Sequence, residues 1–193
     1  MAGSARYTAL LDACVLFPPV VADALISLHV AGLYTARWTA RIDNEWINAA
    51  VRDHDKPREK LEHRRDAMRT AVPDWEVHPA SYETLLIGRD LPDSDDEHVI
   101  AAALAGHADC IVTSNLKHFP ETVLAPLGLE AIHPDDFIVC QFDLDPYAAL
   151  AAFKNMRARL RNPPSTAEAF ATTIERNQLV STALRLREAI GLL

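Results

Sequence analysis

The sequence lacks any long run of apolar residues. No stretch approaches the roughly 18 consecutive apolar residues that a membrane-spanning helix requires. The first residues, Met1–Arg6, lead directly into the apolar segment Tyr7–Leu11. They lack the charged region, long apolar region and cleavage site of a signal peptide. We therefore expect a cytoplasmic protein that does not associate with membranes.

Cysteine is scarce. The 193 residues include 3 cysteines, Cys14, Cys110 and Cys140, which are widely spaced, have apolar neighbours and form no CxxC pair. This pattern is typical of small buried side chains in a reducing compartment. It argues against a disulfide framework and against a cysteine-based zinc site.

Positive charge is also in short supply. The chain has 19 Lys and Arg against 27 Asp and Glu, which gives a formal net charge of −8. Such a balance argues against non-specific nucleic-acid binding by the protein as a whole, although a local basic surface is still compatible with it. It also fits a carboxylate-rich site that takes up a cation.

Apolar residues make up 49% of the chain, enough for a buried core. Short β-branched and apolar runs predict strands at residues 7–11, 74–77, 109–113 and 129–132. Helical spacing of apolar residues predicts helices at 18–31, 36–52, 79–88 and 94–106, and one that begins at 135. Strands that alternate with helices indicate an α/β fold, in which helices flank a central parallel β-sheet.

The chain changes character near Phe142. From there on we find helical patterns and no strand, with a capping box at Ser165–Glu168. The sequence thus predicts an α/β domain over residues 1–141 and an all-helical C-terminal extension over 142–193. We expect this extension to pack on the α/β domain or on a partner, because it carries spaced apolar residues. These are Phe170, Ile174, Val180, Leu184 and Ile190.

The most unusual stretch is Asp93–Ala103, which places several ionisable side chains directly before an apolar helix. One interpretation is capping: Ser94 and Glu97 form a capping-box pattern, and acidic residues suit the positive end of a helix dipole. The other is a divalent metal held by carboxylates at the edge of the core. Asp96 and Asp95 are the candidate ligands, but adjacent helical residues differ by about 100° around the axis, so both should not bind one ion equally.

Further polar groups should gather near this helix if the fold is α/β. Asp12 follows the first predicted strand, Asn115 follows the third, and Glu45 lies beside an apolar helical stripe. Open α/β sheets bind ligands at the carboxyl ends of their strands. Clustered carboxylates repel one another unless a cation binds or some are protonated, and Mg²⁺ or Mn²⁺ prefers such oxygen ligands. Since no histidine or cysteine occupies these positions, zinc is disfavoured.

A mixed-charge segment, residues 52–69, is typical of a solvated helix face. Its arginines are candidates for contacts with nucleic-acid phosphates. Among them we single out Arg58 and Arg65.

Four segments resemble the motifs of PIN-domain proteins, in particular the VapC-type toxins of bacterial toxin–antitoxin modules. In chain order they are Leu11–Leu16, Trp38–Glu45, Leu91–Ala103 and Ile111–Pro120. Together they span about residues 7–140, and their combination is more specific than any one of them.

The resemblance implies a PIN-like fold and a Mg²⁺- or Mn²⁺-dependent endoribonuclease that cleaves RNA phosphodiester bonds with a metal-activated water. It places Asp12, Glu45 and Asp96 as metal-binding acids, with Asp95 as a second candidate in its motif. It also implies an RNA substrate, a DNA-binding antitoxin partner and a homodimer.

The sequence departs from the family pattern at two positions. Asn115 stands where many members have aspartate, and Cys14 stands where an asparagine is frequent. We expect Asn115, with Ser114 and Thr113, to contact water or substrate. Two alternatives stay open: a catalytically degenerate PIN module that binds RNA or protein, and a PIN nuclease that acts outside any toxin module.

Overall fold

The computed structural model describes residues 7–54, 56–86, 88, 91–161 and 163–193. Some predicted segments include residues outside this range. These are residues 1–6 of the N-terminal segment, 55 of the mixed-charge segment, 87 of the predicted helix 79–88 and 162 of the C-terminal extension. The described chain forms two compact units. The first contains residues 7–17 and 34–133, and the second contains 18–33 and 134–193. The predicted boundary between residues 141 and 142 falls within a helix of the second unit and stays a prediction.

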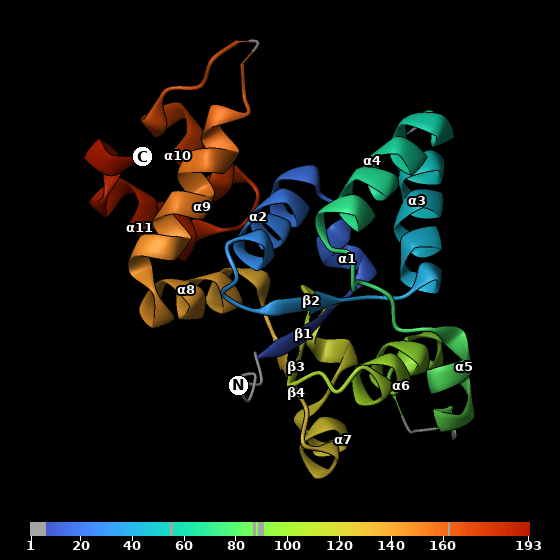
Figure 1. Cartoon of the computed structure of the whole chain (residues 1–193). Helices are drawn as coiled ribbons and strands as arrows, with labels where there is room; N and C mark the ends of the chain where they lie inside the picture. Colours follow the sequence, from blue (N-terminus) through green and yellow to red (C-terminus); the bar gives the residue numbers. More distant parts are fainter. Residues whose placement is uncertain (1–6, 55, 87, 89–90, 162) are drawn as a thin grey trace. The chain divides into compact units, whose positions relative to one another are not determined.

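A four-stranded parallel sheet forms the centre of the first unit (Figure 1). The spatial order is β2-β1-β3-β4. The strands are β1 (Thr8–Leu11), β2 (Thr35–Arg37), β3 (Cys110–Val112) and β4 (Glu130–Ile132). The predicted strands 7–11, 109–113 and 129–132 correspond to β1, β3 and β4, and the predicted parallel α/β architecture is confirmed.

The sequence prediction was wrong around the second strand. Residues 36 and 37 belong to β2, not to a helix, and α3 begins at Ala40. The Oγ1 atom of Thr39 accepts a hydrogen bond from the backbone N–H of Ile42 at 3.1 Å, which caps the new helix. Trp38 and Ile42 are spaced like helical neighbours, so the pattern concealed this boundary. The predicted strand 74–77 is reduced to an isolated bridge between Trp38 and Glu76.

Helices and short turns surround the sheet of the first unit. The helices are α1 (Ala13–Leu16), α3 (Ala40–His54), α4 (Arg58–Ala71), α5 (Pro79–Tyr82), α6 (Glu97–Ala105) and α7 (Glu121–Leu124). The 3₁₀ turns are η1 (Glu83–Leu85), η2 (Ser94–Asp96), η3 (Leu116–His118) and η4 (Ala125–Leu127). Helix α6 packs on β1 and β3 through a fully buried run from Val99 to Ala103. Its small alanines let the helix lie close to the strands, which fixes the position of its N-terminal acids.

Gly106 ends α6 at a tight contact. A Cβ atom at this position would lie 2.8 Å from Cγ2 of Val77 and 3.0 Å from the carbonyl oxygen of Ala102. No larger residue fits without a shift of the backbone, so the glycine holds the end of α6 against the 74–77 segment.

The second unit is all-helical. It consists of α2 (Pro19–Val30), α8 (Pro134–Leu144), α9 (Pro146–Ala158), α10 (Ala167–Arg176), α11 (Val180–Glu188) and the 3₁₀ turn η5 (Ile190–Leu192). Phe153 lies at its centre, with ring centroids 5.6 Å from Phe142 and 6.5 Å from Phe170. The helical character predicted for the C-terminal region is therefore confirmed, and α2 joins the same unit.

The apolar residues predicted to need cover in this region fall into two groups. Phe170 and Ile174 are buried, whereas Val180 and Leu184 are 55% and 58% exposed. Packing of this region on a partner stays a prediction. Within the described residues, no helix is both long enough and apolar enough to cross a bilayer.

Candidate active site

Asp12 lies at the carboxyl end of β1 and serves as the N-cap of α1. Its carboxylate is 6% exposed and accepts three hydrogen bonds. The backbone N–H of Ala13 donates to Oδ1 at 2.6 Å, and the Thr113 hydroxyl donates to Oδ2 at 2.7 Å. Thr113 follows β3, so two adjacent strand ends fix this carboxylate, as the parallel sheet predicts.

The thiol of Cys14 makes the third contact, at 3.0 Å from Oδ2 of Asp12. Burial, the negative charge of Asp12 and this hydrogen bond together raise the pKa of Cys14 to about 12. The thiol therefore stays protonated and donates to the carboxylate. Cysteine thus supplies a polar contact at the position where an asparagine is frequent in the family.

The acidic residues before α6 make different contacts. Asp93 caps η2, because its Oδ1 atom accepts from the backbone N–H of Asp95 at 3.0 Å. Ser94 lies inside this turn, so the expectation that Ser94 starts the helix as a cap is wrong. Asp96 is the N-cap residue of α6, but its side chain makes no capping hydrogen bond. Its carboxylate is instead directed to His118, whose Nδ1 atom lies 2.7 Å from Oδ2.

Glu45, on α3, is held by two nitrogen groups. The Nε2 atom of His98 lies 2.9 Å from Oε1 of Glu45, and the Nε atom of Arg41 lies 3.1 Å from the same oxygen. His98 is 2% exposed and belongs to α6, so this contact links α3 to α6 beside Asp96. A guanidinium nitrogen of Arg41 also reaches the backbone carbonyl of Asp95 at 3.4 Å.

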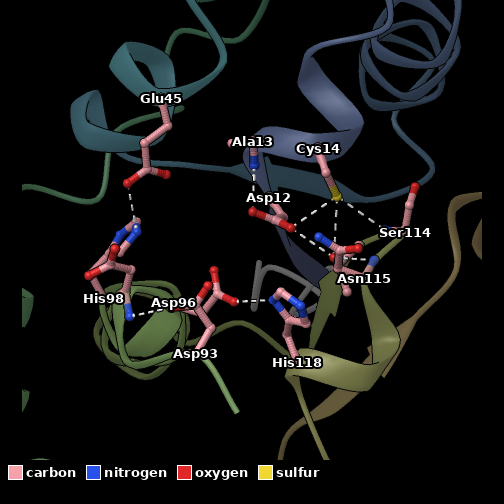
Figure 2. Close-up of polar contacts among 12 residues, drawn as sticks. Asp12, Ala13, Cys14, Glu45, Asp93, Asp96, His98, Ser114, Asn115 and His118 are labelled. Carbon is pink, nitrogen blue, oxygen red and sulfur yellow. Dashed lines mark hydrogen bonds and ion pairs between the residues drawn. The ribbon is translucent and has the colours of Figure 1, made fainter. Parts of the chain in front are cut away.

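The carboxylates of Asp12, Glu45 and Asp96 point toward a common space in Figure 2. The pKa of the Asp96 carboxyl is raised, first by burial and then by the negative charge of Asp12, and the hydrogen bond from His118 offsets this only in part. The electrostatic effect of Asp12 on Asp96 shows that the two acids act on each other. Two acids from distant parts of the sequence thus share one region without full compensation by donors of the protein.

The other candidate residues lie at various places around this region. Ser114 and Asn115 are exposed, and their backbone N–H groups donate to Cys14 Sγ and Thr113 Oγ1 at 3.2 and 3.0 Å. Asp95 is exposed, in contrast to the half-buried Asp96.

The two candidate arginines lie on α4. Arg58 donates to Asn48 at 2.6 Å, and Arg65 pairs with its neighbour Asp66 at 2.8 Å. Neither of these contacts involves Asp12, Glu45 or Asp96.

The donor groups fit a divalent cation. Asp93, Asp96 and His118 each offer one ligand atom, and these atoms all lie within 4.8 Å of one another. Ligands about 2.1 Å from an ion lie about 3 Å apart at right angles and about 4.2 Å apart across it. Small side-chain movements would therefore bring the three groups around one ion.

Sequence reasoning missed the two histidines of this region, His98 and His118. It placed acids at the site and expected no nitrogen ligand there. Each histidine did carry a signal: His98 is the last polar residue before the apolar run of α6, and His118 lies within the fourth motif segment. Periodicity alone could not say which acid each would face.

The family model described as PIN domain matches residues 8–117, which is more than half of the chain. The model described as VapC50 C-terminal domain matches residues 134–188, within the second unit. No solved structure matches significantly.

A curated relative is the protein named "Putative ribonuclease VapC50" from Mycobacterium tuberculosis (strain ATCC 25618 / H37Rv). It is 46% identical over 71 residues, which cover 37% of this chain and 42% of the relative. The match thus spans less than half of the relative's length. The PIN-domain match includes Asp12, Glu45 and Asp96 and extends over more than half of the chain, and on this evidence the chain belongs to the PIN-domain family.

Proposed function

We propose that the protein is a metal-dependent endoribonuclease that cleaves RNA phosphodiester bonds, and that it is the VapC-type toxin of a toxin–antitoxin pair. The observation that carries this proposal is that the carboxylates of Asp12, Glu45 and Asp96 face one common space in a chain of the PIN-domain family (Figure 2). Buried carboxylates that repel each other are stabilised by a cation.

Asp12, Asp96 and Glu45 hold the cation in this proposal, and Mg²⁺ or Mn²⁺ fits their oxygen ligands. When bound, the ion stabilises negative charge on the phosphate and activates a water for attack on phosphorus. Residues of the protein hold these acids in place. Thr113 and Cys14 fix the carboxylate of Asp12, while His98 and Arg41 fix that of Glu45.

The substrate in this proposal is RNA. The exposed side chains of Ser114 and Asn115 stand at the end of β3, next to Asp12, where they can contact the scissile phosphate. Arg58 and Arg65 are offered as contacts to flanking phosphates. Arg58 pairs with Glu62 at 3.7 Å, and Arg65 pairs with the exposed Asp66. Such surface pairs contribute little free energy and can be exchanged for phosphate oxygens.

The name of the mycobacterial relative and the match to the VapC50 C-terminal domain support the toxin assignment. The proposal accordingly includes a cognate antitoxin that binds DNA, a homodimer and action in the cytoplasm. An open reading frame for a small DNA-binding protein next to the gene would favour this assignment over a PIN nuclease in RNA processing.

The decisive experiment induces the protein in cells and sequences the 5′ ends of the RNA. Asp12→Asn preserves the size and planar shape of the side chain but removes its charge and one of its two acceptor oxygens. We expect this variant to lose both RNA cleavage and growth inhibition. Asp143→Asn, which removes an exposed acid on α8 in the second unit, is the matched control and should behave like the parent. Cleavage by folded Asp12→Asn at the parental rate would overturn the proposed mechanism.

A second candidate function is an RNA- or protein-binding module without catalysis. It is favoured by Asn115, because an exposed amide at the end of β3 adds no negative charge to the metal site. Calorimetric titration with Mn²⁺ separates the two functions. An absence of binding at millimolar Mn²⁺ would support the non-catalytic module.

A further inference from the structure

His118 stands out among the residues near the acids because it brings a nitrogen atom into a carboxylate site. It is the last residue of η3, and its Nδ1 atom faces Oδ2 of Asp96 at 2.7 Å. The side chains of His118 and Asp96 are 24% and 23% exposed, so an ion can reach them from solvent. Together with Asp93, they place three ligand atoms within 4.8 Å of one another.

The backbone holds His118 in this position. The N–H of His118 donates to the carbonyl of Asn115 at 2.9 Å, and the next residue, Phe119, is 3% exposed. The buried phenyl ring anchors the turn, so the imidazole does not depend on its contact with Asp96 for its location. Asp93 is fixed independently, by its cap to the backbone of Asp95.

A simple ion pair between His118 and Asp96 accounts for only part of this arrangement. It involves no group of Asp93, although Asp93, which caps η2, also places a ligand atom within 4.8 Å of both groups. The carboxylates of Asp93 and Asp96 together carry more negative charge than one imidazole can neutralise, whereas a divalent cation balances both.

We propose that His118 is a direct nitrogen ligand of the cation, together with Asp93 and Asp96, and that it makes the site prefer a first-row transition ion over Mg²⁺. Mg²⁺ is a hard cation that favours oxygen ligands. Imidazole nitrogen suits transition ions, whose affinity for nitrogen-containing sites rises from Mn²⁺ onward. This inference rests on the metal site of the proposed function and adds two ligands, His118 and Asp93, and a selectivity to it.

The test is electron spin-echo envelope modulation of Mn²⁺ bound to the full chain, which detects nitrogen bonded to the ion. The wild type should show modulation from an imidazole nitrogen. His118→Asn should lose it, because asparagine offers an oxygen in place of that nitrogen. His63→Asn is the matched control, since His63 is an exposed residue of α4, and it should keep the signal. Circular dichroism establishes that each variant is folded.

Calorimetry with Mn²⁺ and Mg²⁺ supplies the second readout. Loss of an outer contact of a metal site typically weakens binding 10–100-fold, so loss of a ligand should weaken Mn²⁺ binding by at least about tenfold. His118→Asp restores a ligand but makes it a carboxylate. The ratio of Mn²⁺ to Mg²⁺ affinity should then fall by about tenfold, while total binding is retained.

The outcomes separate this inference from the proposed function. If wild-type protein binds Mn²⁺ and cleaves RNA but shows no nitrogen modulation, and His118→Asp keeps the parental affinity ratio, the role of His118 is wrong and the nuclease stands. If neither ion binds to the wild type, both proposals fail. If the nitrogen modulation is present but RNA is not cleaved, the assignment of a nitrogen ligand is supported and the proposed nuclease activity is wrong.

Discussion

Two aspartates, one in each compact unit, show what distinguishes a structural carboxylate from a functional one. Asp135 belongs to the first turn of α8 in the second unit and is 6% exposed. It accepts hydrogen bonds from the backbone N–H groups of Ser181 and Thr182, both at 2.8 Å, and from the Thr182 hydroxyl at 2.7 Å. Burial alone would raise the pKa of Asp135, but these hydrogen bonds bring it below its ordinary value.

Asp96 in the first unit presents the opposite balance. Burial and the charge of Asp12 raise its pKa, and the contact with His118 does not compensate. Asp135 therefore has its negative charge satisfied by the protein and fixes the start of α11. The negative charge of Asp96 is not fully compensated by protein groups, and a cation can compensate it. The two acids differ in their number of donors and in the charge around them more than in their burial.

The largest expected effect comes from Asp96→Asn. We expect RNA cleavage to fall by at least about 100-fold, since even outer contacts of metal sites are worth 10–100-fold. The melting temperature in metal-free buffer should stay the same or rise by roughly 1–3 °C, because the substitution removes a repelled charge. Cleavage of a labelled RNA and a thermal melt measure the two quantities. Folded Asp135→Asn should retain cleavage, and equal losses in both variants would break the distinction between the two acids.

Asp135→Asn should show its effect in stability. The asparagine presents an amide where a carboxylate accepted three hydrogen bonds, and hydrogen bonds to charged groups contribute about 1.5–3 kcal/mol each. Because the amide keeps some of these bonds, we expect a loss of about 2 kcal/mol in the free energy of unfolding. Urea denaturation followed by far-UV circular dichroism measures it.

The control for Asp135 is Asp143→Asn, on the same helix. Asp143 forms an exposed pair with Arg185 and should change stability by less than about 0.5 kcal/mol. A loss as large as that of Asp135→Asn would show that α8 responds to any change of charge. The hydrogen bonds to α11 would then not be the cause.

The stability that Asp135 contributes should depend on pH. A folded-state pKa below the unfolded value means that the unfolded chain binds the proton more tightly. The contribution is therefore complete above the unfolded pKa of about 3.9 and is lost as the pH falls through the lower folded value. The difference in unfolding free energy between parent and Asp135→Asn should be constant from neutral pH to about pH 5 and shrink below pH 4. A constant difference down to pH 3 would contradict the lowered pKa.

The sequence was informative where local patterns decide the structure. Apolar β-branched runs identified β1 and β3, and an acid or a polar group after each strand indicated the carboxyl edge of the sheet. Partners far apart in the sequence were not predictable. Asp135 reads as an ordinary first-turn acid, because its donors, Ser181 and Thr182, lie 46 and 47 positions away.

The prediction of a helix over residues 36–52 missed the boundary between β2 and α3 for a different reason. Trp38 and Ile42 have helical spacing, yet the backbone of Trp38 pairs with Trp75 and Val77 from the segment that follows α4. A tertiary contact thus overrides the local period. The role of His98 was not predictable for a similar reason, because the sequence does not show that α3 places Glu45 against it.

The smallest expected effect is that of replacing His98. The directions in which the melting temperature and the cleavage rate change are the informative part. His98 is 2% exposed, its Nε2 atom contacts Glu45, and within the described residues its Nδ1 atom has no hydrogen-bond partner. A buried polar atom without a partner costs stability. Replacing the ring with an apolar side chain of similar size should therefore raise the melting temperature.

His98→Leu should accordingly be more stable than the parent but cleave RNA about tenfold more slowly, since Glu45 loses the group that positions it. His98→Gln, whose amide nitrogen can reach Glu45 in place of Nε2, should recover most of the cleavage. The fall should lie in kcat, with KM nearly unchanged, because His98 contacts Glu45 and not the substrate. A purely structural histidine would lose stability and activity together in His98→Leu. Opposite signs would show that His98, like Asp96, is kept for the reaction at a cost in stability.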